Sequence, residues 1–299
     1  MVTTSFFLII FAPMQKFARR LIILAIIFAS LSLLAGPCSF LFESLEILHA
    51  SWRVQMARAI DVRIKFLGRG FLTSRGFVSQ YGQDQWLKEK VFFGKNGGFF
   101  VDIGAHDGVE FSNTFLFEKD QGWQGLAIEP VPESFAALQK NRSCQCLQGC
   151  VSAISGTVIF SQLTIPSENA DGVMLSGLKQ HYDAQHTARI QRELLRYGGQ
   201  LQEISVPSFR FMELIDRYGI THIDYLSVDT EGSEAEILQS IDFSRIPISV
   251  IGVENNYGEL SVPRWLSKNG YRRVKRIGRD DFYFAKDFKP LLRSSAPHL

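Results

Sequence analysis

The sequence has little of the features that would place it in several large classes of protein. Its 299 residues include only four cysteines, too few for a disulfide framework. Neither sign of charge dominates, because 32 Lys and Arg oppose 30 Asp and Glu, and this balance argues against nucleic acid as a partner. Internal repeats and low-complexity tracts are absent. Charged residues make up only 21% of the chain and apolar residues 46%, which excludes disorder as its main state.

Charge is missing altogether from two stretches near the N-terminus, residues 1–15 and Leu21–Phe42. The residues between them include three basic ones, Lys16, Arg19 and Arg20. The two stretches explain why the mean hydropathy of the chain, +0.03, is slightly high for a soluble enzyme. A helix over the second stretch would rise about 33 Å, close to the thickness of the hydrocarbon core of a bilayer. The pattern predicts a single-pass membrane anchor within residues 1–43.

Two other interpretations of this segment stay open. A cleaved signal peptide would use Leu21–Ala35 as its apolar region and would leave the mature chain exported, although no clear small-x-small cleavage site follows. A buried helix of a soluble domain is the third interpretation.

The rest of the chain divides into a linker, a folded body and a tail. Residues 44–78 are predicted to form an amphipathic linker helix rich in arginine. This helix would either lie on anionic lipid headgroups or pack on the body. The body spans residues 79–288, and residues 289–299 form the tail.

Within the body, short apolar strands alternate with helices. Strands are predicted at 98–104, 123–129, 144–152, 157–162, 223–228 and 248–254. Helices are predicted at 132–141, 209–218 and 233–240, and an antiparallel hairpin at 271–276 and 281–285. This alternation predicts an α/β, Rossmann-like fold with a mostly parallel sheet, whose ligands bind at the carboxyl ends of the strands. Residues 161–204 fit the alternation poorly and predict a polar loop-and-helix insertion, a candidate acceptor region.

The first motif with chemical content is VDIGAHDG at residues 101–108, where a strand ends in an acid and two glycines follow. Gly104 would provide the tight turn, and Gly108 would let a ligand approach the backbone. The dinucleotide fingerprint G-x-G-x-x-G is absent. Asp102 would repel a pyrophosphate and attract an amino group, which suits S-adenosylmethionine, a ligand without phosphate. A plain strand–turn–helix corner would show the same spacing. Asn113 is a further residue that could face the cofactor.

Glu129 ends the next predicted strand, one βα unit after the glycine turn. An acid in this place can accept hydrogen bonds from both hydroxyls of a ribose. Pro130 then removes a backbone donor and turns the chain outward. An isolated Glu before Pro is more often a surface turn, so the ribose assignment depends on the glycine turn that precedes it.

The third motif is IDYLSVDTEGSE at residues 223–234, a strand that delivers Asp229 and Glu231 to the carboxyl edge of the sheet. The glutamates of this motif could instead only favour the positive start of the following helix. The next strand ends in Glu254 and Asn255 at the same edge.

Taken together, VDIGAHDGVEFSNTFLFEK, GWQGLAIEP, SGL at 176–178 and IDYLSVDTEGSE resemble the FkbM family of methyltransferases. SQYGQD at 79–84 is similar to the first segment of that family. The resemblance covers residues 79–285 and implies a class I methyltransferase fold that uses S-adenosylmethionine to O-methylate hydroxyls of sugars and natural products. It also implies positions for individual residues: Asp102, Gly104 and Gly108 on the cofactor turn, Glu129 at the ribose, and Asp229 in the D-x-E-G-x-E signature, beside the cofactor. The first 78 residues match nothing in the core of the family.

Methyl transfer to a hydroxyl needs in-line positioning and a base that takes the hydroxyl proton. The candidates for this base are Asp229, Glu231, His106 and Glu254. The acids and amide at Asp229, Glu254 and Asn255 are similar to the Mg²⁺ site of catechol-type O-methyltransferases. We expect these three residues either to bind a hard divalent cation, which would acidify a bound hydroxyl, or to hydrogen-bond the acceptor directly.

Other residues with metal-binding side chains do not form a recognisable site. Cys144, Cys146 and Cys150 lack a second ligand pair for zinc and are predicted to be free thiols. His181 and His186 lie in the insertion and are predicted to be solvated.

The sequence therefore predicts a membrane-anchored, S-adenosylmethionine-dependent O-methyltransferase. Its acceptor would be a glycan, a glycolipid or another hydroxylated small molecule. The rival hypothesis is a catalytically silent Rossmann-like domain that serves as a membrane-tethered binding or trafficking module. A nucleotide-dependent oxidoreductase is a third option, weakened by the missing pyrophosphate turn.

Overall fold

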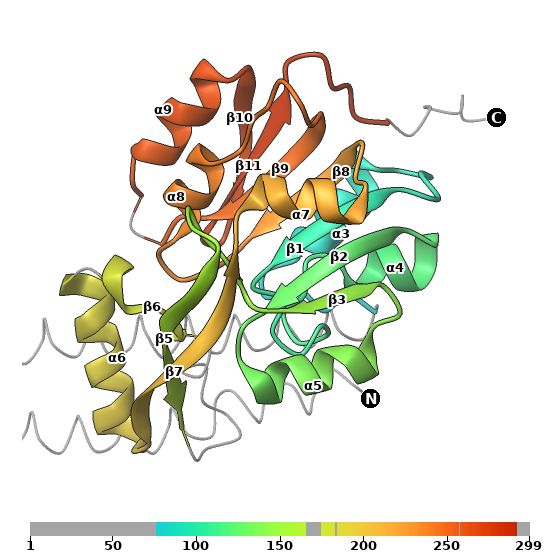
Figure 1. Ribbon diagram of the computed structural model, residues 1–299. Coiled ribbons are helices and arrows are strands. Elements are labelled where there is room, and N and C mark those ends of the chain that lie inside the picture. Colours follow the sequence, from blue (N-terminus) through green and yellow to red (C-terminus); the bar gives the residue numbers. More distant parts are fainter. Residues whose placement is uncertain (1–75, 166–174, 183, 257, 292–299) are drawn as a thin grey trace, which may run out of the picture. The chain divides into compact units, whose positions relative to one another are not determined.

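The computed structural model describes residues 76–165, 175–182, 184–256 and 258–291 (Figure 1). The predicted anchor or signal and the predicted linker helix up to residue 75 lie outside these residues, as do the last eight positions of the chain. Within the described ranges, every helix is too short or too polar to cross a bilayer.

The larger of the two sheets has seven strands in the order β10-β11-β9-β8-β1-β2-β3 (Figure 1). The strands are β1 (Phe99–Ile103), β2 (Gln124–Glu129), β3 (Gln145–Gln148), β8 (Ile223–Val228), β9 (Ile248–Glu254), β10 (Tyr271–Ile277) and β11 (Asp280–Ala285). Neighbours are parallel except at β11, which is antiparallel to β9 and to β10. The predicted mostly parallel sheet with a C-terminal hairpin is confirmed.

Helices cover both faces of this sheet, and the strands are accordingly apolar on both sides. The helices of the body are α3 (Gln83–Trp86), the π-helical η1 (Leu87–Val91), α4 (Phe115–Gln121), α5 (Pro132–Asn141), α7 (Phe211–Tyr218), α8 (Glu234–Gln239) and α9 (Ser261–Lys268). Val101 and Leu226 belong to a core shared with α7, α8 and α9. Phe100 and Tyr225, one position away on the same strands, pack instead with η1 and α4. Alternate residues of each strand thus enter two different cores, which is why the strands lack the polar alternation of a half-exposed sheet.

A second sheet lies where the sequence predicts a loop-and-helix insertion. Its strands are β4 (Cys150–Val151), β5 (Gly156–Thr164), β6 (Gly177–Leu178) and β7 (Gln200–Phe209), in the order β4-β7-β5-β6. Strands β5 and β7 pair antiparallel from Gly156↔Ser208 to Thr164↔Gln200. The helix α6 (Ala184–Tyr197) and the 3₁₀-helix η3 (Lys179–His181) lie between them in the sequence. The prediction for 161–204 is therefore wrong at both ends, where polar residues belong to paired strands rather than to loops.

The predicted strand over 144–152 is divided between the two sheets at Gly149. Residues before it form β3 of the large sheet, and residues after it form β4 of the second sheet. A side chain at Gly149 would place its Cβ 2.7 Å from the carbonyl oxygen of Pro207 on β7. The glycine therefore permits the close approach that passes the chain from one sheet to the other.

The order of the large sheet reverses between β1 and β8. The chain runs outward through β2 and β3, then returns to β8 and continues outward through β9 on the other side. The chain therefore continues from β1 and from β8 toward opposite edges of the sheet, and a doubly wound sheet binds its ligands at such a point.

Candidate active site

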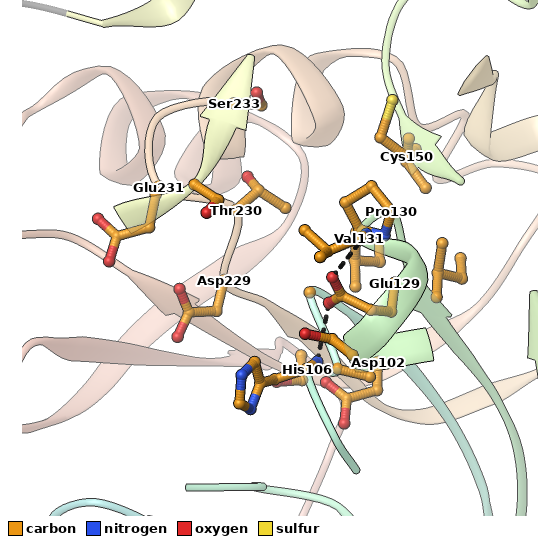
Figure 2. A pocket seen from close by; sticks show the side chains of 18 of the residues that line it. Asp102, His106, Glu129, Pro130, Val131, Cys150, Asp229, Thr230, Glu231 and Ser233 are labelled. Carbon is orange, nitrogen blue, oxygen red and sulfur yellow. Dashed lines mark hydrogen bonds between the residues drawn. The ribbon is translucent and has the colours of Figure 1, made fainter. Parts of the chain in front are cut away.

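A cavity opens at this reversal point, enclosed by the large sheet and by the second sheet. Its walls are the turn after β1, the end of β2, the loop after β8 and residues of β4, β5 and β6 (Figure 2). It encloses about 980 Å³, counting its open mouth. Asp102, Gly104, His106, Asn113, Glu129 and Asp229 line this cavity. Six residues that the sequence places beside a cofactor or a reacting group are thus brought to one site.

Gly104 fixes the floor of the cavity by letting two loops touch. Its φ is +88°, in the left-handed region that favours glycine. A Cβ there would overlap the carbonyl oxygen of Asp229, and the Asp229 N–H donates to Ile103 O at 3.0 Å. The turn after β1 and the loop after β8 therefore lie backbone against backbone, which leaves the cavity above them free.

Glu129 is held by the backbone on both of its carboxylate oxygens. The N–H of His106 donates to Oε2 and the N–H of Val131 donates to Oε1, each at 2.9 Å (Figure 2). Each oxygen keeps a second lone pair for a ligand hydroxyl. Burial raises the pKa of Glu129 to about 7, while the two backbone donors oppose this rise.

Asp102 and Asn113 offer polar groups to the same cavity. The hydroxyl of Thr114 donates to Asp102 Oδ2 at 2.6 Å, and burial raises the pKa of Asp102 above its usual range. The side-chain oxygen of Asn113 is buried and has no hydrogen-bond partner within the structure. A buried acceptor of this kind at a cavity wall fits a ligand that brings a donor.

Three carboxylates gather at one end of this region. Oxygens of Asp229, Glu231 and Glu254 all lie within 4.8 Å of one another. Burial and then the charge of the neighbouring acids raise the pKa of Glu254 well above its usual range, and burial raises the pKa of Glu231 to about 7. Asp229 keeps exposed surface, and the charges of the surrounding acids raise its pKa as well. Three carboxylates this close do not all ionise, so the cluster holds at least one proton at neutral pH.

A second cavity adjoins the first at these acids. Its lining includes Glu231 and Glu254 together with His181 and His186 from the insertion. Glu231 also lines the first cavity and is therefore the wall between the two. Its Oε2 accepts from Arg189 Nη1 and from Asn256 Nδ2, both at 3.3 Å, and lies 3.6 Å from His186 Nδ1.

Comparison with known proteins identifies the family. A model of the methyltransferase FkbM domain matches residues 102–273, more than half of the chain. The chain belongs to the FkbM methyltransferase family. It is 27% identical over 159 residues to Methyltransferase sdnD of Sordaria araneosa, which covers 48% of this chain and 60% of that protein. The chain thus spans less than two thirds of the length of this curated relative.

Two solved methyltransferase structures with low sequence identity also match this FkbM chain. The methyltransferase FkbM of Methylobacillus flagellatus KT is 13% identical, with a TM-score of 0.36 over 63% of this chain and 43% of that one. A TehB-like S-adenosylmethionine-dependent methyltransferase of Corynebacterium glutamicum ATCC 13032 is 12% identical, with a TM-score of 0.34 over 80% of this chain and 96% of that one.

Gly108 and Asn255, which the FkbM resemblance and the sequence assign to the site, make other contacts in the structure. Gly108 is not part of the cavity lining, and a Cβ there would lie 2.6 Å from both Leu138 Cδ1 and Arg142 Cγ, so it serves the packing of α5. Asn255 lines the second cavity beside Glu231 and Glu254, but its Nδ2 donates to Asp281 Oδ2 at 3.0 Å and its Oδ1 accepts from the N–H of Glu259 at 2.8 Å. Glu231, predicted as a base, lies with Asp229 and Glu254 in the carboxylate cluster.

His106 lies at the first cavity, and the three described cysteines are free thiols. His106 lines the first cavity with φ +51° and is not part of the second cavity. Burial works against its protonation, but Asp107 and Glu129 outweigh burial and raise the pKa of His106. Cys144, Cys146 and Cys150 are free thiols as predicted, and the acid cluster is the only set of metal-binding side chains among the described residues.

Sequence reasoning missed the contribution of the insertion to the acid cluster. His186, predicted to be solvated, is only 3% exposed, and its Nε2 lies 3.1 Å from the carbonyl oxygen of Leu175. Arg189, three residues after His186 on α6, donates to Glu231, and His186 also lies beside that carboxylate. The available signal was the i, i+3 spacing of a histidine and an arginine on an amphipathic helix, which places both on one face.

The Glu129 pKa of about 7 makes cofactor binding depend on pH. We expect the dissociation constant of S-adenosylhomocysteine, measured by isothermal titration calorimetry, to fall about tenfold from pH 6 to pH 8, because ionised Glu129 accepts the ribose hydroxyls more strongly. Glu129→Gln, which cannot ionise, should bind more weakly and show a flat profile over this range. A variant profile as steep as that of the unchanged chain would assign the pH dependence to another group.

Proposed function

We propose that this FkbM-family chain is an S-adenosylmethionine-dependent O-methyltransferase. Its acceptor would be a hydroxyl of a glycan, a glycolipid or another hydroxylated small molecule. The observation that carries the proposal is the wall shared by the two cavities, where the acid cluster meets both. One cavity suits a cofactor without phosphate, and the other supplies a separate approach for an acceptor.

The residues of the first cavity fit S-adenosylmethionine by their chemistry. Asp102 offers a carboxylate to an ammonium, Glu129 offers two fixed oxygens to a ribose, and Asn113 offers an unpaired carbonyl oxygen. All three attract donors or positive charge, and none is a phosphate-binding group. When bound, S-adenosylmethionine supplies a methyl group on a positively charged sulfur.

The acid cluster supplies the base for an acceptor hydroxyl. Asp229 lines the cofactor cavity and keeps exposed surface, so it could take the proton of an acceptor hydroxyl when the proton held by the cluster lies on Glu231 or Glu254. Glu231 and Glu254 lie close enough to share that proton. Glu234 has a different task, since it accepts from the N–H groups of Thr230 and Gly232 at 2.9 and 3.1 Å and thereby holds the loop in place.

A divalent cation is the second form that this chemistry could take. The three clustered carboxylates are the hard oxygen donors that Mg²⁺ prefers, and such an ion would acidify a bound hydroxyl. The carboxylates of Asp229, Glu231 and Glu254 suit this role better than the predicted set with Asn255, because both polar atoms of the Asn255 side chain already have hydrogen-bond partners.

Labelled S-adenosylmethionine and a panel of hydroxylated acceptors test the proposal on the full-length protein. We expect transfer of label to a neutral polyhydroxyl acceptor and tight binding of S-adenosylhomocysteine. Binding without turnover on any acceptor would support the silent module instead, and absence of binding would refute the enzyme. EDTA distinguishes a mechanism with a bound divalent cation from one in which a carboxylate takes the proton directly. Activity that survives chelation would exclude the cation and support the carboxylate base.

The uncharged N-terminal run supports a further proposal about location. We propose that Leu21–Phe42 holds the chain at a membrane as a single-pass anchor, with export after signal cleavage as the alternative. In the first case the lipid bilayer is a partner, and acceptors at the membrane surface become accessible.

A further inference from the structure

A buried cation lies behind the glycine turn, outside the cavity lining. The side chain of Arg142, which follows α5, is 0% exposed. Its Nε donates to Glu118 Oε2 at 2.6 Å and its Nη1 to the carbonyl oxygen of Gly108 at 3.0 Å. Its guanidinium carbon lies 5.1 Å from the ring centre of Phe100. Burying a charge costs free energy, and the ion pair with Glu118 and the hydrogen bond to Gly108 offset part of this cost while they fix the side chain.

The remaining nitrogen of Arg142 points toward the cofactor cavity through one intermediary. Nη2 donates to Thr114 Oγ1 at 3.1 Å, and the Thr114 hydroxyl donates to Asp102 Oδ2 at 2.6 Å. Arg142 has only donors, so it occupies a lone pair of the hydroxyl and leaves the single Thr114 proton for Asp102. The three residues form a one-way chain of donors that ends on a carboxylate at the cavity wall.

This chain counteracts the effect of burial on Asp102. Burial favours the neutral acid, whereas the charge of Arg142 and the hydrogen bond from Thr114 favour the carboxylate. Arg142 therefore acts on Asp102 in two ways, directly through its charge and, as a smaller effect, through the hydrogen bond that Thr114 donates. A second hydroxyl, that of Ser227 on β8, also favours the ionised form.

Gly108 belongs to the same arrangement. A Cβ at this position would lie 2.6 Å from Arg142 Cγ, and the Gly108 carbonyl accepts from Arg142 Nη1. The second glycine of the motif thus makes room for the stem of the arginine, while the first lets the turn meet the loop after β8.

We propose that Arg142 is a positioning residue for the cofactor, which through Thr114 holds the Asp102 carboxylate oriented toward the ammonium of the amino-acid tail. This inference rests on the proposed function, because it assumes that the first cavity binds S-adenosylmethionine. The proposal predicts that Arg142 affects binding of the amino-acid tail and not of the nucleoside. Glu129 on the neighbouring strand would hold the ribose independently of Arg142.

Two ligands that differ only in the tail test the proposal on the full-length protein. S-adenosylhomocysteine carries the ammonium and carboxylate, whereas 5′-deoxy-5′-methylthioadenosine keeps the adenosine and the thioether and lacks both. For Thr114→Val, which removes the hydroxyl and keeps the shape, we expect the dissociation constant of S-adenosylhomocysteine to rise about tenfold and that of methylthioadenosine to change less than about twofold. Thr114→Ser, which retains the hydroxyl, should restore the binding of S-adenosylhomocysteine.

A second substitution and a control keep the test independent of folding. Arg142→Met should show the same selective loss, and Lys95→Met, which breaks the ion pair of Lys95 with Asp224 away from both cavities, should leave both dissociation constants unchanged. Equal weakening of both ligands, or no weakening of S-adenosylhomocysteine, would overturn the positioning role. If the unchanged chain binds neither ligand, the proposed function itself fails, and this outcome is distinct from a loss of selectivity in the variants.

Discussion

Replacing Asp229 with asparagine is expected to lower the turnover number for methyl transfer by about 10²- to 10³-fold, the range typical of losing a general base. Asparagine has nearly the same shape as aspartate but cannot take a proton. The backbone of Asp229 also meets the Gly104 turn, and asparagine preserves that backbone contact. We therefore expect the dissociation constant of S-adenosylhomocysteine to change less than about threefold, well below the loss in turnover.

Asp229 is better placed to act as the base than the other two acids of the cluster, Glu231 and Glu254. Asp229 lines the first cavity and retains exposed surface, whereas Glu231 is buried and already accepts from Arg189 and Asn256. Glu254 lines the second cavity and not the first, and one of its oxygens is buried with no hydrogen-bond partner among the residues that the structure describes. The acid that combines access to both the methyl donor and the cluster is Asp229.

Single-turnover and steady-state assays of the full-length protein measure the effect. Asp242→Asn is the matched control, because it makes the same change at an exposed aspartate outside both cavities and should leave turnover unaltered. If Asp229→Asn retains full turnover while Glu231→Gln or Glu254→Gln loses it, the base is one of the other two acids.

The parts of this site that could be predicted from sequence are those fixed by neighbouring strands. Asp102 and Asp229 both follow from runs of apolar residues that end in an acid, and parallel pairing places β1 beside β8. Glu254 joins them because β9 pairs in parallel with β8, so the two strand ends meet at one edge. Local pattern and one topological rule were enough for these acids.

The parts that could not be predicted depend on contacts between distant segments. The β5–β7 pairing joins Thr164 to Gln200 across 35 intervening residues, and nothing in the local polarity of either strand indicates the partner. The helix between them then carries His186 and Arg189 onto Glu231. Because the register of the hairpin decides where α6 lies, the second cavity is a property of the folded chain rather than of a motif.

The glycines of the first motif show the same division. Both have positive φ angles, and the tight turn at Gly104 was expected from the motif, whereas Gly108 was expected to face a ligand. Their neighbours could not be foreseen, because the contact of Gly104 lies on the loop after β8 and that of Gly108 on the residue after α5. The motif indicates the two positions where a Cβ atom would not fit, but only the folded structure shows which neighbouring atoms exclude it.

The second large effect is expected from Gly104→Ala. The added methyl group would overlap the carbonyl oxygen of Asp229, and both sides of this contact are backbone that cannot rotate away. The turn and the loop after β8 would have to separate, displacing Asp229 from the cavity. We expect the free energy of unfolding to fall by about 3 kcal/mol or more and the affinity for S-adenosylhomocysteine to fall by at least about 100-fold.

Gly122→Ala separates the backbone strain from the steric contact. Gly122 ends α4 with φ +62°, and no atom lies within 4 Å of the Cβ that alanine would add. This control should lose only the cost of a left-handed alanine, about 1 kcal/mol, and should bind S-adenosylhomocysteine normally. Denaturant unfolding and calorimetric titration of both variants measure the difference. If the two alanines cost the same and both bind the ligand, the contact between the turn and Asp229 does not hold the cavity open, and the glycine serves only the turn.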